Sequence, residues 1–250
     1  QWNLGDIAFT TYNSDGTGDQ FSFVLLRSVS VGESISFTDN GWFAAGGFRS
    51  TEDTLTLTFG ANYNCGSQIF ISAAPFGARD ESMTSAGVLV GSPLALATAG
   101  DQIFAYDPNN APSAIDSSGF IAAIGMNGAW DADATSSNTS ALPGVFTDGV
   151  NALSISPEVD NAQYNCSVTS ASPTSLLTAM NSSANWNVDD ATNYVVPAPC
   201  TIGCSSPPCN NPDVPNVLLN PQTVCDGDSS LMTIIGCLLY TSPSPRDRYI

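Results

Sequence analysis

The sequence predicts an all-β protein: an antiparallel β-sandwich with one short helix, then a linker and an incomplete second β domain. Three observations predict it. Short stretches alternate apolar and polar residues, clusters of Gly, Asn, Asp and Pro separate them, and no helix-length apolar periodicity recurs between them as a βαβ fold requires. A chain of 250 residues is long enough for one large β domain, or for one domain and part of another.

The expected strands follow one another along the first 156 residues. Residues 54–59 read Thr-Leu-Thr-Leu-Thr-Phe, which places threonines on one face and large apolar side chains on the other, as in a sheet with one solvated face. Residues 34–38 alternate in the same way, and residues 21–26 become apolar on both faces, as in a central strand. The other expected strands are residues 6–12, 68–72, 87–90, 102–106, 120–125 and 152–156.

One helix is expected, at residues 172–180. Ser172 or Thr174 can cap its first turn, and its apolar face consists of Leu176, Leu177 and Met180. The helix leads to Trp186, which we expect to pack near one end of the sandwich.

The composition changes after residue 196. We expect the β-sandwich at residues 1–196, a Pro/Cys-rich linker at residues 197–213, and the start of a truncated β domain at residues 214–236. Residues 237–250 differ from the rest, and residues 237–247 resemble a translated sequencing adapter, so we exclude this end from the fold. On that interpretation the natural protein is cut near Gly236 and continues beyond it. The alternative is a genuine Ser/Pro-rich tail.

The charge and the missing residue types exclude several classes of function. The chain has 23 acidic and 5 basic residues, a formal net charge of −18, no histidine and, since every basic residue is arginine, no lysine. A Ser-His-Asp triad and common catalytic zinc sites need histidine, and Schiff-base and P-loop enzymes need lysine. The negative charge repels nucleic-acid phosphates and anionic lipids. We therefore expect no nucleic-acid partner and, since no apolar run approaches the ~20 residues of a membrane span, no membrane insertion.

The cysteines favour an oxidising compartment. Six of the seven precede the adapter-like segment, in a chain rich in Ser, Thr, Asn and Gly, which is typical of secreted or cell-surface proteins. The start at Gln1 without an initiator methionine fits signal-peptide removal, and truncation would look the same.

Two cysteines, Cys65 and Cys166, fall inside the expected sandwich, and each follows a Tyr-Asn pair. We expect them to form a disulfide that closes a loop of about 100 residues; two buried free thiols are the alternative. The remaining four, Cys200, Cys204, Cys209 and Cys225, allow three pairings among themselves, and the sequence does not choose between them. Disulfides are favoured over zinc there because the segment has no CxxC pair and no histidine.

A turn that contains Asn13, Asp15 and Asp19 is the candidate metal site. Calcium takes six to eight oxygen ligands from carboxylates, amides and carbonyls, which this turn can supply. Residues 107–116 and 131–133 form two further acidic loops. None of the three has EF-hand spacing, and Asp and Asn are also favoured in turns for their local hydrogen bonds, which is the alternative interpretation.

Two tryptophans and a carboxylate pair are possible ligand-binding or catalytic groups. Trp130, between polar loop residues, is the candidate ligand-binding aromatic, whereas Trp42 is expected in the core rather than as a sugar platform. Adjacent strand residues such as Glu52 and Asp53 point to opposite faces and cannot both face one glycoside substrate. We expect Arg49 to pair with Glu52 on the surface, and we expect no catalytic site.

Four segments resemble a module of secreted, Bacteroidetes-type multidomain surface proteins: residues 5–9 (Gly-Asp-Ile-Ala-Phe), 12–16 (Tyr-Asn-Ser-Asp-Gly), 21–26 (Phe-Ser-Phe-Val-Leu-Leu) and 37–42 (Phe-Thr-Asp-Asn-Gly-Trp). Phe48-Arg49, Glu52 and residues 160–164 extend the resemblance over about residues 5–190. A looser similarity is to lamin-tail-like, immunoglobulin-type sandwiches, and residues 221–231 look like the start of an immunoglobulin-like repeat.

The resemblance implies a non-catalytic extracellular module with a structural or adhesive role in an array that ends in a C-terminal sorting signal. Its partners would be neighbouring domains of the same chain, or an extracellular glycan or protein. Two alternatives stay open: a calcium-assisted carbohydrate-binding module, and an accessory domain of a secreted hydrolase.

Overall fold

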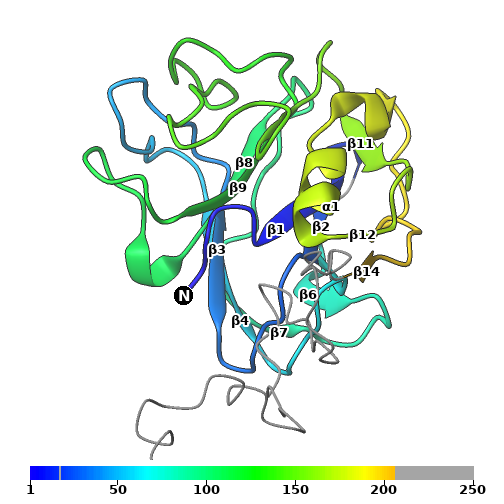
Figure 1. The fold of residues 1–250 in the computed structure, drawn as a ribbon. Helices are drawn as coiled ribbons and strands as arrows, with labels where there is room; N and C mark the ends of the chain where they lie inside the picture. The colour runs from blue at the N-terminus through cyan, green and yellow to red at the C-terminus, as the bar shows by residue number, and fades with distance from the viewer. Residues whose placement is uncertain (17, 206–250) are drawn as a thin grey trace, which may run out of the picture. The chain divides into compact units, whose positions relative to one another are not determined.

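The computed structural model describes residues 1–16 and 18–205, of which Gln1–Cys204 form one compact unit. Two six-stranded sheets dominate this unit, and the short helix α1 (Pro173–Met180) lies beside strand β1 (Figure 1). The strand pairs are antiparallel except two short parallel ones. The predicted antiparallel β-sandwich with one short helix is therefore confirmed.

The first sheet has the strand order β13-β11-β1-β2-β5-β6. Its central strand β1 is buried at every position, and it contacts strand β9 of the second sheet and helix α1. A register shift between Phe9 and Thr11 marks a bulge in β1. The strands are β1 (Ile7–Asn13), β2 (Gln20–Leu25), β5 (Gln68–Ala73), β6 (Phe76–Asp80), β11 (Asn161–Tyr164) and β13 (Trp186–Asp189).

The second sheet has the order β10-β9-β8-β3-β4-β7. In β4 the leucines and Phe59 are buried while the threonines are at least partly exposed, as the alternation predicts. Hydroxyl pairs cross from β3 to β4, for example Ser36 Oγ to Thr56 Oγ1 at 2.7 Å. The strands are β3 (Ser34–Thr38), β4 (Thr54–Phe59), β7 (Gly87–Gly91), β8 (Gln102–Tyr106), β9 (Phe120–Gly125) and β10 (Leu153–Ser154).

Aromatic side chains fill the space between the sheets. Phe37 of β3 lies 5.1 Å from Phe21 and 5.0 Å from Phe23 of β2, centroid to centroid. All three rings are almost completely buried. Because large buried rings contribute several kcal/mol each, this contact is a main source of sandwich stability.

The predicted helix is confirmed, and Trp186 is buried as a packed tryptophan in the edge strand β13. Ser172 caps α1 by accepting a hydrogen bond from the Ser175 amide at 3.2 Å. Leu176 and Met180 are buried, and Trp186 donates its indole N–H to the Met180 carbonyl at 2.7 Å. Short 3₁₀ turns occur at η1 (Pro108–Asn110) and η2 (Ser183–Asn185).

A second aromatic cluster lies on the outer face of the second sheet. Phe104 of β8 and Phe120 of β9 point away from the main core, yet both are buried. The loops at residues 39–53 and 126–152 cover them, bringing in Trp42 and Phe146 (Figure 1). The prediction that Trp42 is a core residue is confirmed, since it is 6% exposed.

The predicted pairing of Cys65 with Cys166 is wrong. Each is disulfide-bonded, but Cys65 pairs with Cys204 and Cys166 pairs with Cys200. The reason is that the segment expected to open a linker runs back along the sandwich. Its residue Gly203 starts strand β14 (Gly203–Cys204), which pairs in parallel with β12 (Ser170–Ala171).

The sandwich unit consequently extends to Cys204 rather than ending at residue 196. Ala198, Cys200 and Ile202 are buried, and Gln68 of β5 donates to the Ala198 carbonyl at 3.0 Å and the Cys200 carbonyl at 2.7 Å. Cys209, Cys225, the remaining linker at residues 206–213, the second β domain at residues 214–236 and the adapter-like residues 237–250 lie outside the described residues.

Candidate functional site

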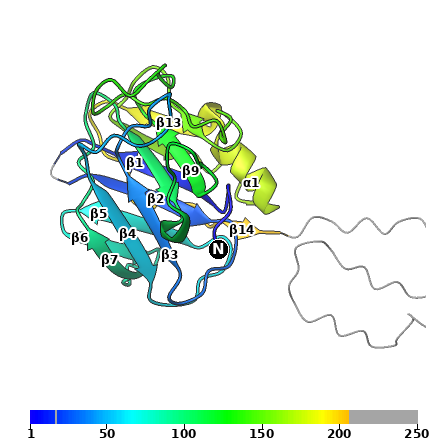
Figure 2. The ribbon, with the colours of Figure 1, turned by 90° about the vertical axis from the view of Figure 1, so that its left-hand side faces the viewer.

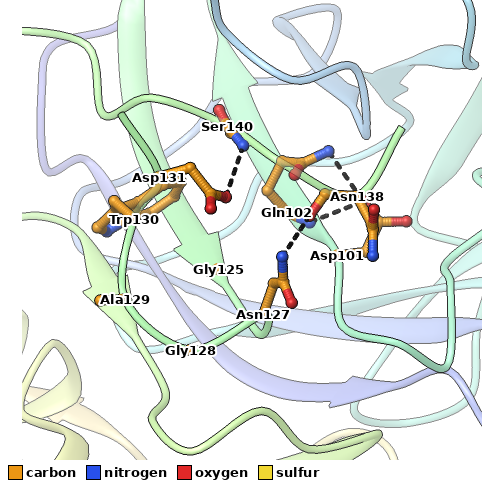
Figure 3. A pocket seen from close by; sticks show the side chains of 10 residues that line it. All are labelled: Asp101, Gln102, Gly125, Asn127, Gly128, Ala129, Trp130, Asp131, Asn138 and Ser140. Atoms are coloured by element: carbon orange, nitrogen blue, oxygen red, sulfur yellow. Dashed lines mark hydrogen bonds between the residues drawn. The ribbon is translucent and has the colours of Figure 1, made fainter. Parts of the chain in front are cut away.

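A small polar hollow lies beside Trp130, where β8 begins and β9 ends (Figure 3). Its volume is about 10 Å³, enough for about one water molecule, so a larger ligand would lie across its mouth. The lining residues are Asp101, Gln102, Gly125, Asn127, Gly128, Ala129, Trp130, Asp131, Asn138 and Ser140.

Trp130, the residue predicted to bind a ligand, is half-buried and held from three sides. Its ring lies 5.6 Å from the Phe104 ring, and a methyl group on Gly125 would be only 3.3 Å from its Cη2 atom. The indole N–H points to Asp148 Oδ1 at 3.3 Å. The indole therefore forms a fixed aromatic wall of the hollow, rather than the freely exposed side chain that its polar neighbours suggested.

Hydrogen bonds within the chain fix the polar side of the hollow. Gln102 Nε2 donates to Asp101 Oδ1 at 2.8 Å, to the Ser137 carbonyl at 3.0 Å and to the Asp39 carbonyl. Asn127 Nδ2 donates to the Asn138 carbonyl at 2.9 Å (Figure 3).

Asp131 and Ser140 also line the hollow, and Asp131 Oδ2 accepts a hydrogen bond from the Ser140 amide at 3.2 Å. Within the part of the chain that the structure describes, Asp131 Oδ1 and Asn127 Oδ1 accept no hydrogen bond. These two oxygens are among the acceptors that the hollow offers to a hydroxylated ligand.

Three buried or partly buried aspartates hold one backbone segment, and one of them, Asp101, also lines the hollow. The consecutive amides of Ala95, Leu96 and Ala97 donate at 2.9 Å to Asp39 Oδ2, Asp19 Oδ2 and Asp101 Oδ2, respectively. The side chains of Leu94 and Leu96 enter the main core. The aspartates thus close one end of the sandwich by fixing the segment at residues 92–100.

Burial changes the acidity of this group. It raises the pKa of Asp101 to about 8, with a smaller contribution from the nearby charges of Glu52 and Asp39. It raises the pKa of Asp39 to about 6 and that of Glu52 to about 7. The buried Tyr12 hydroxyl also has a raised pKa, from burial first and then from Asp101, Asp19 and Asp39.

The buried carboxylates of Asp39 and Asp101 accept backbone hydrogen bonds on both oxygens. Both oxygens of Asp39 accept backbone N–H groups, from Asp53 and Ala95, at 2.9 Å each. Asp101 is 1% exposed and likewise accepts on both oxygens. Sequence reasoning missed these two residues because an aspartate at a strand end looks like an ordinary turn residue, and only distant loops bury it.

The structure attaches the candidate calcium ligands to three different segments. Asn13 is buried, and its carboxamide donates to the Tyr194 carbonyl at 2.8 Å and accepts from the Tyr194 amide at 2.9 Å. Asp15 accepts from Asn161 Nδ2 at 3.2 Å, while Asp19 holds the Leu96 amide. Over residues 1–16 and 18–205, no group of three or more acidic, histidine or cysteine side chains could hold a metal ion.

The other acidic loops use their carboxylates in local hydrogen bonds. Asp107 Oδ1 accepts from the Asn109 amide and Asp133 Oδ1 accepts from the Ala134 amide, both at 2.9 Å. These contacts are the local turn hydrogen bonds that were the alternative to calcium.

The expected Arg49–Glu52 ion pair is absent from the described residues. Arg49 instead donates from Nη1 to the Ala134 carbonyl at 2.9 Å, which ties the two long loops together. Both ion pairs in the described part of the chain belong to Arg27, with Asp6 at 2.9 Å and Glu33 at 2.6 Å. Arg27 also lies over the Trp2 ring, 4.0 Å from its centroid.

The helices of the described residues are too short and too polar to include a membrane-spanning one. The chain was compared with protein-family models, curated proteins and solved structures, and none of them matches it.

Proposed function

We propose that the sandwich is a non-catalytic module of a secreted or cell-surface protein, with a structural or adhesive role. The observation that carries the proposal is the pair of disulfides that join Cys204 and Cys200 to the body of the unit. Disulfides persist in oxidising compartments and are rare in the cytosol. A unit closed on itself in this way suits a module that must stay folded outside the cell.

The use of the buried acids supports a scaffold role. Asp39 and Asp101 are at most 1% exposed, and both oxygens of each accept backbone amides, which favours a structural role over proton transfer to a substrate. The two long loops are packed over Phe104 and Phe120, which holds their backbone in one arrangement. Rigid loops on a β-sandwich are a common platform for binding another molecule.

The test uses the full chain, purified with its disulfides intact, on a panel of polysaccharides and extracellular proteins. Binding is measured by surface retention, and hydrolysis is measured by release of reducing ends. We expect retention on at least one surface and no release above a blank without protein. Release of reducing ends that falls with Asp101→Asn, and not with the exposed control Glu81→Gln, would overturn the non-catalytic assignment.

A carbohydrate ligand is the second candidate, and the hollow beside Trp130 favours it. A fixed indole can stack on the apolar face of a sugar ring, while the free acceptors Asp131 Oδ1 and Asn127 Oδ1 can receive its hydroxyl protons. Retention on glycans should fall at least about tenfold in Trp130→Ala, which corresponds to ~1.4 kcal/mol. Phe76→Ala, at a partly exposed ring elsewhere, is the matched control.

A chelator distinguishes two forms of this second candidate. Retention that survives chelation supports a calcium-free site at the hollow, whereas retention lost on chelation and restored by calcium supports the calcium-assisted module. Equal retention by Trp130→Ala and the unmodified chain would mean that the hollow does not bind the glycan.

A further inference from the structure

Strand β7 forms one edge of the second sheet. It pairs with β4 along one side, and among the described residues no strand of the second sheet lies on its other side. Figure 2 shows β6, the edge strand of the first sheet, close to β7. The residues just before β7 are joined to β6, by a bridge between Ser85 and Arg79 and by a hydrogen bond from the Ala86 amide to the Ala78 carbonyl at 3.0 Å.

The register shows which backbone groups of β7 face outward. The Gly60 amide donates to the Ala86 carbonyl, and the Ser92 amide donates to the Thr54 carbonyl. Hydrogen-bonded pairs alternate along antiparallel strands, so Val88 and Val90 direct their N–H and C=O groups toward β4. Gly87, Leu89 and Gly91 therefore direct theirs away from β4, toward the free edge.

The side chains at this edge are apolar, and no charged residue or proline within β7 prevents another strand from pairing with it. Val88 and Val90 are 65% and 66% exposed on the outer face, next to the threonines of β4. On the inner side, a groove of about 340 Å³ is lined by Phe76, Gly77, Ala78, Arg79, Ser85, Gly87 and Leu89. Edge strands are usually protected from pairing by charges, prolines or bulges, and Gly87–Gly91 contains no charge and no proline.

We propose that β7 is a self-association strand, through which two copies of this chain pair edge to edge and antiparallel. The strand reads Gly-Val-Leu-Val-Gly, which is the same in both directions. A two-fold axis at Leu89 places it opposite the partner's Leu89 and places Val88 opposite the partner's Val90.

The outward backbone groups agree with this arrangement. Leu89 is one of the residues whose N–H and C=O face the edge, so the two leucines at the axis exchange both hydrogen bonds. An isologous interface needs such a self-complementary position. In the pair, each Val88 gains a β-branched neighbour directly across the strand, and each leucine enters the groove of the other copy beside Phe76.

The proposed interface is small, and the negative charge of the two copies opposes its formation. Five residues of edge strand lie at the low end of protein interfaces, so the dissociation constant should be in the range of roughly 10 μM to 1 mM. A net charge of −18 on each copy opposes association, and salt screens that repulsion. Pairing through this apolar strand should therefore strengthen with salt. If an acidic segment of another molecule occupied the groove through an ion pair with Arg79, that complex would instead weaken with salt.

Sedimentation velocity of the full chain, up to about 1 mM and at roughly 0.05 and 1 M NaCl, tests the proposal. We expect a monomer–dimer equilibrium that shifts toward dimer in high salt. Val88→Lys/Val90→Lys should weaken it at least about tenfold, and Val31→Lys/Val195→Lys, with the same charge change at 60% and 74% exposed valines, should not. The single variant Val90→Lys replaces the double variant if the latter loses its thermal transition.

Any of three results would overturn the proposal. The first is a chain that remains monomeric at the highest concentration in both salts, and the second is a dimer that dissociates in high salt. The third is equal association of the β7 variants and the control variants.

Discussion

Cys65, at the end of the loop before β5, is bonded to Cys204, which lies 139 residues further along the chain. The Cys166–Cys200 bond closes a smaller loop of 34 residues inside that span. Together they hold the last strand of the unit, β14, against its body. In the chain-entropy model the larger loop stabilises the folded state by about 5 kcal/mol and the smaller by about 4 kcal/mol.

The first prediction concerns these two bonds separately. Cys65→Ser/Cys204→Ser should lower the free energy of unfolding by about 2–5 kcal/mol and should cost more than Cys166→Ser/Cys200→Ser, because it opens the longer loop. Urea denaturation of both variants and of the unmodified chain measures the difference. Equal losses in the two variants would show that loop length does not determine the effect.

The second prediction is a loss of stability in alkaline solution. Burial raises the pKa of Asp101 to about 8 and that of Asp39 to about 6, so the folded state binds these protons more tightly than the unfolded state does. Their stabilisation is complete below the ordinary aspartate pKa and is lost as the pH rises through the raised values. Between pH 5 and 9 the free energy of unfolding should fall by about 5 kcal/mol, which lowers the melting temperature by about 10–20 °C.

Scanning calorimetry across that pH range is the measurement, and the slope with pH is the readout. Asp101→Asn should flatten the slope even if it lowers stability at every pH, because the amide does not titrate. Glu81→Gln, at an exposed acid, should leave the slope unchanged. A chain more stable at pH 9 than at pH 5 would contradict the expected direction of the pH dependence.

The third prediction is that calcium does not change the stability of the sandwich. The Asn13 carboxamide is already bonded through both of its polar atoms to Tyr194, and Asp15 and Asp19 hold separate segments. Melting curves with millimolar calcium and with a chelator should coincide, since a ligand that binds only the folded state raises the midpoint. If calcium raised the melting midpoint and Asp15→Asn abolished that increase, the turn would be a metal site after all.

The fourth prediction concerns the second aromatic cluster. The Phe120 ring lies 5.0 Å from Trp42 and 5.3 Å from Phe146, so it connects both covering loops to β9. Phe120→Ala should cost about 3–5 kcal/mol and reduce the near-ultraviolet circular dichroism of the neighbouring tryptophans. Phe76→Ala, at a ring that is 39% exposed, should cost much less. Similar losses in the two variants would mean that the loops do not depend on this ring.

The regular elements were predictable where a local pattern determines them. The alternation in β4 and the Ser172 cap of α1 follow from neighbouring residues, and both are confirmed. Strand β6 was missed because Phe-Gly-Ala-Arg-Asp has little strand character, and its pairing with β5 decides its conformation.

The site was predictable only in part. Trp130 could be found from its polar neighbours, but its burial depends on Gly125 and Phe104, which are near only in the fold. Asp101 looks like any turn aspartate until remote loops cover it. The disulfide partners depend on where the segment after residue 196 runs, and cysteine spacing does not determine that.

Disulfide mapping of the full chain, digested without reduction, tests most directly the central claim that two disulfides close the sandwich. Trypsin has no site between Arg79 and Arg246, so thermolysin, which cleaves before bulky apolar residues such as Ile202, is the suitable protease. We predict cross-linked peptides that join Cys65 to Cys204 and Cys166 to Cys200. Free thiols at these four positions, or a peptide that joins Cys65 to Cys166, would contradict it.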